Sequence, residues 1–88
     1  MDTTIHVVFG STGEYSDRSE WPVKAFRTEA TAQELVLAAT KSANEVFAAR
    51  KRKYSYNVPK GANPHDPHME MDYTGTRYYV VTVALEDR

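Results

Sequence analysis

The sequence predicts an α+β fold, in which a small antiparallel sheet of about three strands carries one long helix packed on one face. Three observations predict it. The first run has the two-residue apolar period of a strand, a long middle segment has helical spacing, and the last run alternates again. The expected order is strand, strand, helix, strand. The 88 residues suffice for a single domain, 1–88, with a small core.

The first strand is predicted over residues 3–9, where β-branched and aromatic residues dominate. Its larger apolar side chains share one side: Ile5, Val7 and Phe9. The run 10–13, Gly-Ser-Thr-Gly, is expected to end this strand, and the polar run 14–20 is expected to form a loop. A second strand is predicted over residues 21–26. Because Pro22 lacks a backbone N–H, this strand lies at a sheet edge or begins at Pro22.

The helix is predicted over residues 28–53. Apolar residues at steps of three and four trace one face of it: Ala32, Leu35, Val36, Ala39, Ala43, Val46 and Phe47. Thr28 suits the N-terminal cap because its hydroxyl can accept a backbone N–H, and Thr31 with Glu34 is an alternative capping box. Four basic residues, 50–53, fill the last turn, where the helix dipole favours cations.

Residues 54–76 are predicted to form a long loop, because prolines and glycines interrupt every period there. A short extra strand is allowed where Met69, Met71 and Tyr73 alternate with acidic residues. A loop of this length inside a small domain is typically either functional or disordered.

The last strand, residues 77–85, is apolar on both faces, so it is expected to lie centrally or with both faces covered. If the first strand is central instead, the helix returns the chain so that the last strand pairs antiparallel beside it. The helix is expected to pack on one set of sheet residues: Ile5, Val7, Phe9 and Val81. The other face, with Tyr78, Val80 and Trp21, would then be exposed or covered by the loop, and dimerisation or a partner protein would hide it.

The composition excludes several classes of protein. Without cysteine there is no disulfide, no thiol nucleophile and no thiolate metal site. The 11 Lys and Arg against 12 Asp and Glu leave a net charge of -1, unlike a dedicated nucleic-acid binder. No apolar run approaches the ~20 residues of a membrane helix, and the start lacks a signal-peptide pattern. A cytoplasmic protein without a membrane partner is expected.

Two motifs resemble parts of known sites. Residues 10–13 follow a strand as phosphate-binding loops do, but neither the P-loop nor the dinucleotide fingerprint is complete, so we interpret them as a turn. His65 and His68, with the acidic residues of the 65–72 loop, match part of a zinc site in a metal-dependent hydrolase. The helical spacing of such sites is missing, so we predict a solvated loop, no metal and no cofactor.

The segment 50–56 is the part of the chain most typical of a nucleic-acid contact. It contains these candidates: Arg50, Lys51, Arg52, Lys53, Tyr54 and Tyr56. Phosphates attract the cations, and the tyrosines can stack on bases. Positions 50–60 sum to +5, whereas positions 66–72 sum to -3 and are able to neutralise them. Nucleic-acid binding is therefore the alternative function, against a solvated helix end.

No complete catalytic set is present, so we predict that the protein is not an enzyme. Its aromatic residues exceed what so small a core can bury with their polar ends satisfied. Tyr and Trp are enriched at the hot spots of protein interfaces. The partner-binding candidates are Tyr15, Trp21, Tyr54, Tyr56, Tyr73 and Tyr78.

Four segments together resemble a group of small phage and prophage proteins of unknown function: residues 9–17 (FGSTGEYSD), 21–26 (WPVKAF), 63–67 (NPHDP) and 71–76 (MDYTGT). The resemblance covers most of the chain. It implies a phage accessory protein that acts in the cytoplasm of a bacterial host, and it implies no catalytic residue. We therefore expect a non-enzymatic protein-interaction module that forms a homodimer or inhibits a host defence or metabolic protein.

Overall fold

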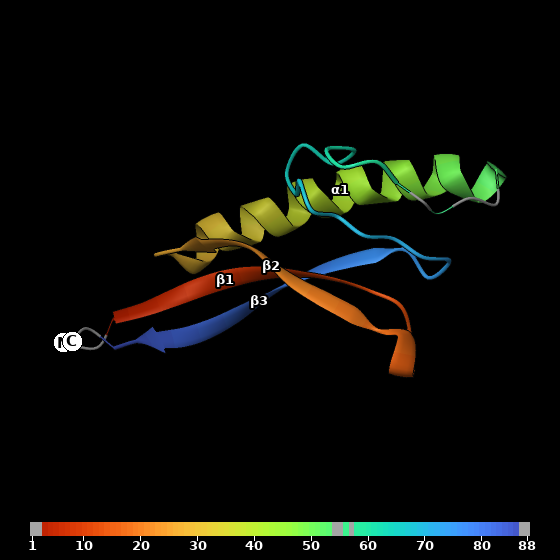
Figure 1. Ribbon diagram of the computed structural model, residues 1–88. Helices are drawn as coiled ribbons and strands as arrows, with labels where there is room; N and C mark the ends of the chain where they lie inside the picture. The colour runs from red at the N-terminus through yellow and green to blue at the C-terminus, as the bar shows by residue number, and fades with distance from the viewer. Residues whose placement is uncertain (1–2, 54–55, 57, 87–88) are drawn as a thin grey trace.

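The computed structural model of the protein describes residues 3–53, 56 and 58–86, apart from the side chains of Arg52 and Lys53. A three-stranded antiparallel sheet carries one long helix on one face, which confirms the predicted α+β fold (Figure 1). The elements follow in this order: β1 (Thr3–Thr12), the short 3₁₀ turn η1 (Tyr15–Asp17), β2 (Ser19–Phe26), α1 (Glu29–Lys53) and β3 (Thr76–Leu85).

The first strand, β1, is the central one, and the sheet order is β2-β1-β3. The prediction of a central or doubly covered last strand is therefore wrong, because β3 is an edge strand covered on one face. The predicted end of the first strand at residue 9 is also wrong. Gly10 pairs with Trp21 on one side and with Tyr78 on the other, and the ladders continue to Thr12. Pairing on both sides satisfies the backbone groups of this segment, so it stays extended.

The helix begins as its cap predicts. The Thr31 N–H donates to the Thr28 hydroxyl oxygen at 3.3 Å, and α1 starts at the next residue, Glu29, so the alternative capping box is not used. Three alanines of the predicted stripe are fully buried: Ala32, Ala39 and Ala43. The other members of the stripe are half-buried against the same core: Leu35, Val36, Val46 and Phe47. The predicted stripe is confirmed, and its small residues let the helix approach the sheet closely.

The helix covers the opposite sheet face from the predicted one. The covered side carries Val8, Tyr78 and Val80, whereas the expected residues (Ile5, Val7, Phe9 and Val81) point away. The physical reason is Gly10, which shares the covered face with Val8. A Cβ atom on Gly10 would lie 2.6 Å from Cε2 of Trp21, so the absent side chain makes room for the indole between sheet and helix.

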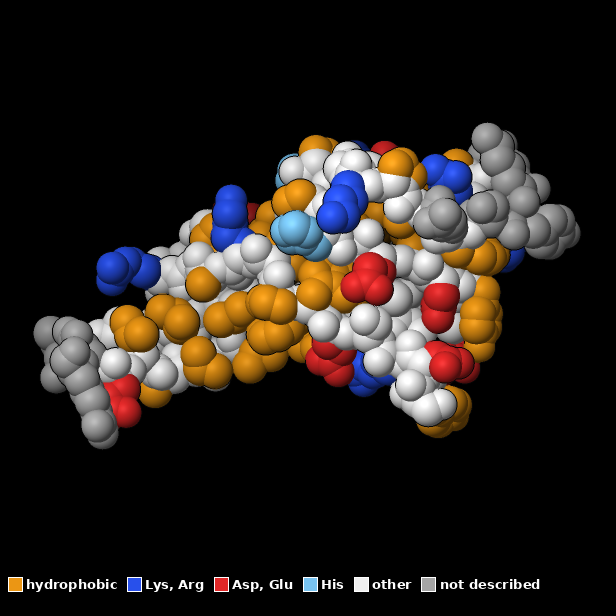
Figure 2. All heavy atoms as spheres, in the orientation of Figure 1, with side chains coloured by type: hydrophobic (Ala, Val, Ile, Leu, Met, Phe, Trp, Pro, Cys, Tyr) orange, Lys and Arg blue, Asp and Glu red, His pale blue; other side chains and the backbone are white. Residues whose placement is uncertain are grey.

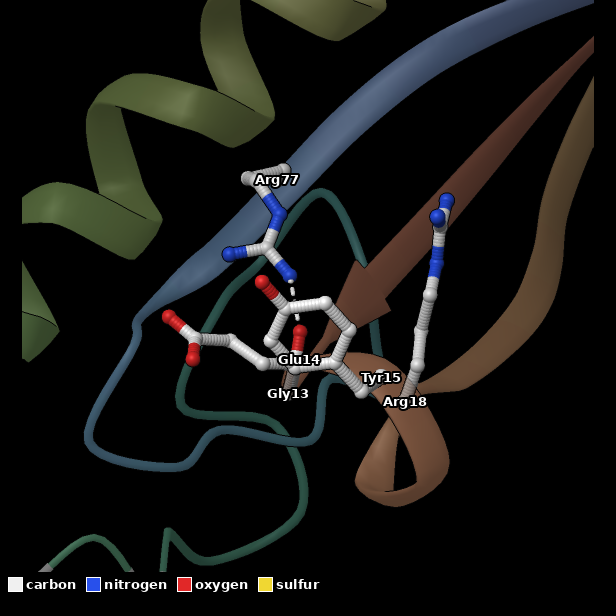
Figure 3. A pocket seen from close by; sticks show the side chains of 5 residues that line it. All are labelled: Gly13, Glu14, Tyr15, Arg18 and Arg77. Carbon is white, nitrogen blue, oxygen red and sulfur yellow. Dashed lines mark hydrogen bonds between the residues drawn. The ribbon is translucent and has the colours of Figure 1, made fainter.

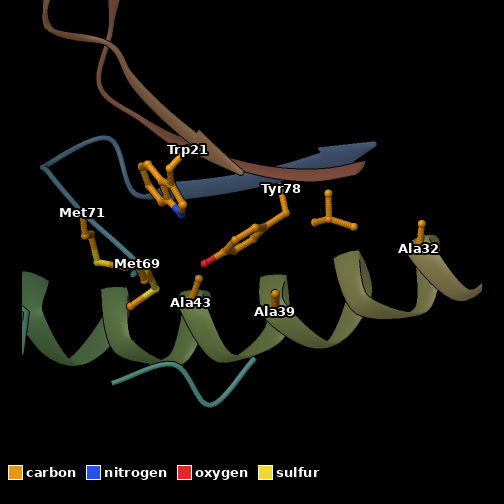
Figure 4. Close-up of a cluster of buried hydrophobic side chains, with 8 residues drawn as sticks. Trp21, Ala32, Ala39, Ala43, Met69, Met71 and Tyr78 are labelled. Carbon is orange, nitrogen blue, oxygen red and sulfur yellow. The ribbon is translucent and has the colours of Figure 1, made fainter. Parts of the chain in front are cut away.

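The loop between α1 and β3 packs against the core. Met69 and Met71 are buried, 6% and 8% exposed, and lie between the sheet and the helix (Figure 4). The short strand allowed around Tyr73 is not formed, since residues 69–73 have no strand pairing. The two methionines therefore extend the core beyond the three alanines of α1.

The molecule is elongated. Its radius of gyration is 14.3 Å and its extents are 51 × 27 × 17 Å, whereas a compact domain of this length has a radius of gyration of about 12 Å. In Figure 1, the C-terminal end of α1 lies at one end of the long axis. The start of β1, paired with the end of β3, lies at the other (Figure 1). Within the part of the chain that the structure describes, no helix has the length and apolarity needed to cross a membrane.

Candidate functional site

The candidate site is the sheet face that α1 leaves uncovered, which we call the open sheet face. Cross-strand pairing arranges its side chains in four rows: Phe9 between Pro22 and Tyr79, Val7 between Ala25 and Val81, Ile5 beside Val83, and Thr3 beside Leu85. The rings of Phe9 and Tyr79 stack with their centroids 5.9 Å apart. Figure 2 shows hydrophobic side chains gathered over the part of the sheet where the start of β1 pairs with the end of β3.

The apolar residues of this face are unusually exposed. Val81, Val83 and Leu85 have 36%, 41% and 48% of their surface accessible, although strands favour such residues where they are half-buried. Val8 is the largest apolar side chain that is fully buried. A contiguous exposed apolar patch rimmed by polar residues is typical of an interaction surface.

A fifth row, which is polar, closes one end of the open sheet face. It consists of Ser11, with Glu20 on one side and Arg77 on the other. Glu20 forms an ion pair with Arg18 at 3.1 Å and accepts a hydrogen bond from the Tyr79 hydroxyl. That hydrogen bond raises the pKa of Tyr79 above its ordinary value of 10.0. Among the described residues that make up these rows, the charged ones thus lie at one end of the face.

An open pocket of about 500 Å³ lies next to this polar row (Figure 3). It is lined by Gly13, Glu14, Tyr15, Arg18 and Arg77. The Arg77 guanidinium donates to the Gly13 carbonyl at 2.7 Å. Tyr15 is 93% exposed and has a φ of 51°, which is a strained backbone conformation for a bulky residue. Its lining carries both signs of charge, with one carboxylate (Glu14) and two guanidinium groups (Arg18 and Arg77).

Asp72 holds the loop before β3 against the end of β1. Its carboxylate accepts hydrogen bonds from the Thr74 N–H at 2.8 Å and from the Thr12 hydroxyl at 3.2 Å. Partial burial raises the pKa of Asp72, but hydrogen bonds from Thr74 and Thr12 and the charge of Arg77 outweigh this effect. The pKa of Asp72 therefore lies below its ordinary value of 3.8.

A cluster of buried polar side chains attaches the loop between α1 and β3 to the side of the sheet that α1 covers. Asp66, 1% exposed, accepts at Oδ2 from Trp21 Nε1 and from the Tyr78 hydroxyl, both at 2.8 Å. Asn63 is fully buried and donates to the Ala39 carbonyl at 3.0 Å and to the Tyr78 hydroxyl at 3.2 Å. The rings of Trp21 and Tyr78 lie between the sheet and the helix (Figure 4).

This cluster has the properties of a structural network. Burial, and then the hydrogen bond to Asp66, raise the pKa of Tyr78 above its ordinary value of 10.0, so its hydroxyl stays protonated as a donor. No buried side-chain nitrogen or oxygen among the described residues lacks a hydrogen-bond partner. Saturated buried networks stabilise one arrangement and leave no free group for a substrate.

The structure places the predicted partner-binding aromatics in different environments. Tyr15 and Tyr73 are 93% and 64% exposed, but they lie outside the strands, in η1 and in the loop before β3. Trp21 and Tyr78 are buried in the polar cluster, so their surplus polar ends are satisfied internally. Tyr56 stacks on Phe47 with ring centroids 5.8 Å apart. Tyr54 lies outside the described residues.

The predicted basic segment is only partly described. Arg50 is half-buried and Lys51 is exposed, whereas the side chains of Arg52 and Lys53 lie outside the described part. The contact between Tyr56 and Phe47 occupies one of the two rings expected to stack on bases. The acidic stretch is engaged elsewhere, because Asp66 bonds to β2 and β3 and Asp72 bonds to β1.

The described residues offer no metal site. His65 and His68 are both exposed, and no three His, Asp or Glu side chains in residues 3–51, 56 and 58–86 gather closely enough to hold an ion. The Asp66 carboxylate, which was the nearest candidate ligand in sequence, is saturated by hydrogen bonds.

The sequence-based interpretation expected one apolar sheet face to stay open, but it chose the wrong face because it assigned Ile5, Val7, Phe9 and Val81 to the core. The last strand is apolar on both faces from Tyr79 to Leu85, and a chain with one helix covers one face of a sheet. One apolar face therefore had to remain open, but the pattern did not show which one.

Comparisons of the chain with known protein families, with curated proteins and with solved structures find no match.

Proposed function

We propose that this protein is a non-enzymatic protein-interaction module that binds a protein partner through the open sheet face. The observation that carries the proposal is the exposure of Val81, Val83 and Leu85 in rows of otherwise apolar side chains. Covering such side chains contributes roughly 25 cal/mol per Å² of apolar surface removed from water.

The distribution of polar groups supports the proposal. Protein interfaces have an apolar centre and a polar rim. The open sheet face has this arrangement, with apolar rows along β1 and β3 and charged residues Arg18, Glu20 and Arg77 at one end. The polar groups that resemble catalytic or metal-binding residues in the sequence, by contrast, serve the packing of the loop.

The resemblance to small phage and prophage proteins supplies the setting for this proposal. A phage accessory protein in the cytoplasm of a bacterial host acts on proteins, and host defence or metabolic proteins are the expected targets. An exposed apolar sheet face suits binding to another protein, because proteins bind one another over broad surfaces, whereas small substrates bind in clefts that enclose them.

Surface variants test the proposal directly. We would compare the wild-type chain with Val81→Glu, which places a charge among the exposed apolar side chains of β3. Leu37→Glu is the matched control, because Leu37 is an exposed apolar residue (71%) on the outer side of α1. Self-association would be measured by light scattering, and host proteins retained on the immobilised chain would be quantified by mass spectrometry.

The expected result is that Val81→Glu reduces self-association or retention at least tenfold, whereas Leu37→Glu retains both. Circular dichroism must show that both variants are folded. Equal behaviour of the wild-type chain and Val81→Glu in both measurements would refute the proposal.

A further inference from the structure

We propose that the partner on the open sheet face is a second copy of this chain, so that two sheets pack face to face with the helices outermost. The inference rests on the proposed function, because it names the partner of that same surface. The expected assembly has four layers, with the two sheets about 10 Å apart as in other sheet-on-sheet packings.

The size of the face fits a second copy. β1 and β3 contain 10 residues each, and β2 contains 8. At ~3.3 Å per residue and ~4.8 Å between strands, the face measures roughly 33 by 14 Å. Two such faces in contact bury on the order of 1,000 Å² once the relief of the side chains is included, which is about the smallest area of a specific interface. A reversible dimer of moderate affinity is expected.

The shape of the face is self-complementary about one particular axis. Within a row, β3 contributes a large side chain and β2 a small one: Tyr79 opposes Pro22 across Phe9, and Val81 opposes Ala25 across Val7. A two-fold axis parallel to β1 lays β3 of each copy over β2 of the other. Large side chains then meet small ones, as interdigitated packing requires.

The positions of the charged residues favour the same two-fold axis, parallel to β1. Glu20 on β2 and Arg77 on β3 occupy one row, on opposite sides of Ser11. The axis parallel to β1 places Glu20 of each copy opposite Arg77 of the other. An axis perpendicular to the strands would instead place this charged row over the apolar end at Leu85. Complementary charges at the rim of an interface set the orientation of the partners.

Pairing of two β3 edges into one continuous sheet fits the structure less well. α1 packs over β3 more than over β1 or β2. Edge pairing would bring the two β3 strands to about 4.8 Å, whereas packed helices need 8–10 Å between their axes. The helices would therefore crowd each other in a continuous sheet, but they lie far apart in a face-to-face dimer.

The first experiment measures the dissociation constant by sedimentation equilibrium from about 1 to 500 µM. The wild-type chain is expected to dimerise in this range. Val81→Glu and, as a second variant on β2, Ala25→Glu each bury a charge in the interface and are expected to raise the dissociation constant about 100-fold. Leu37→Glu, on the outer side of α1, is expected to leave it within twofold.

The second experiment locates the contact. The chain contains no cysteine, so a single introduced thiol reports one position. Val7→Cys lies on the central strand near the expected axis. Because sheets about 10 Å apart hold the two thiols too far from each other for a direct disulfide, a short thiol-specific cross-linker is used and is expected to link most of the dimer covalently. Leu37→Cys is the control and is expected to remain unlinked. In a dimer paired through β3 edges, the two Val7 positions are separated by several strand spacings and would not be linked.

Two outcomes would overturn the second-copy inference. One is a wild-type chain that is monomeric at 500 µM. The other is a dimer that tolerates both glutamate variants and does not form the Val7→Cys link. If the monomer retains a host protein that Val81→Glu loses, the proposed function stands and this inference fails. If the chain is monomeric and Val81→Glu does not change the retention of host proteins, both the proposed function and the second-copy inference fail.

Discussion

Gly10 is the residue on which the packing of the covered face depends. Alanine at this position would place a Cβ atom 2.6 Å from the Trp21 ring, which is closer than side-chain atoms approach each other. We expect Gly10→Ala to lower the free energy of unfolding by about 1–3 kcal/mol, because the indole must move away from Asp66. Urea unfolding followed by circular dichroism measures this.

The matched comparison for Gly10→Ala uses the partner residue. In a Trp21→Leu background, the smaller side chain leaves space for the new methyl group, so the added cost of Gly10→Ala should fall below about 0.5 kcal/mol. An equal cost in both backgrounds would show that the effect comes from the strand backbone and not from the contact with Trp21.

Asp72 makes the stability of the protein depend on pH in the acid range. Its pKa is lowered in the folded state, so its contribution is complete above the ordinary value of 3.8 and is lost as pH falls through the folded-state pKa. Asp72→Asn should therefore destabilise the protein by about 1 kcal/mol at pH 7 and by much less at pH 2.5. Urea unfolding of both proteins at the two pH values tests this. A constant difference would contradict the expected ionic contribution.

At the scale of elements, the loop between α1 and β3 is held by hydrogen bonds that cross from the sheet. Asp66 binds Trp21 on β2 and Tyr78 on β3, and Asn63 binds the Ala39 carbonyl on α1. One short segment of the loop thus joins three elements. The loop serves packing, although its length is typical of functional loops.

Removal of the Asp66 carboxylate should release this loop. Asp66→Ala leaves the buried Trp21 N–H and the Tyr78 hydroxyl without their acceptor, and it should cost about 2–4 kcal/mol of unfolding free energy. Protection of the Asn63 region against hydrogen exchange should fall at the same time. Asp17→Ala, at an exposed acidic residue of η1, is the control and should cost less than about 0.5 kcal/mol. Equal costs for the two variants would refute the role of Asp66.

Prediction from sequence succeeds for elements whose signal is local. The helix was predicted over residues 28–53 and is observed over Glu29–Lys53, because the apolar spacing and the Thr28 cap are local properties. The predicted end of β1 was wrong because its last residues are extended only through pairing with β2 and β3. The buried Asn63 and Asp66 resemble ordinary loop residues, since their partners on the strands and the helix lie 12 to 45 positions away in the sequence.

At the scale of the whole molecule, the elongated shape and the open sheet face make stability depend on association. If only folded chains form the dimer, dimerisation stabilises the folded state, and the unfolding temperature rises as the protein concentration increases. We expect the wild-type Tm to rise by a few degrees for each tenfold increase in concentration between about 5 and 500 µM. Val81→Glu should show no such increase, and Leu37→Glu should behave as the wild-type chain does. Calorimetry at three concentrations measures this, and a constant wild-type Tm would count against association.

The residue pattern alone predicts the α+β class and the helix with its buried stripe. It also leads to the expectation that an apolar sheet face needs a partner. Only the folded arrangement decides which face that is. β3 is largely apolar on both sides, so its alternation does not distinguish the two faces, and the alternation of β1 favours the wrong one because Ile5, Val7 and Phe9 share the side that stays open. The choice depends on contacts between residues far apart in sequence: the Trp21 ring on Gly10, and the Tyr78 hydroxyl on Asp66. These contacts place the side of the sheet that carries Trp21 and Tyr78 under α1 and leave the opposite side, with Val7 and Phe9, uncovered.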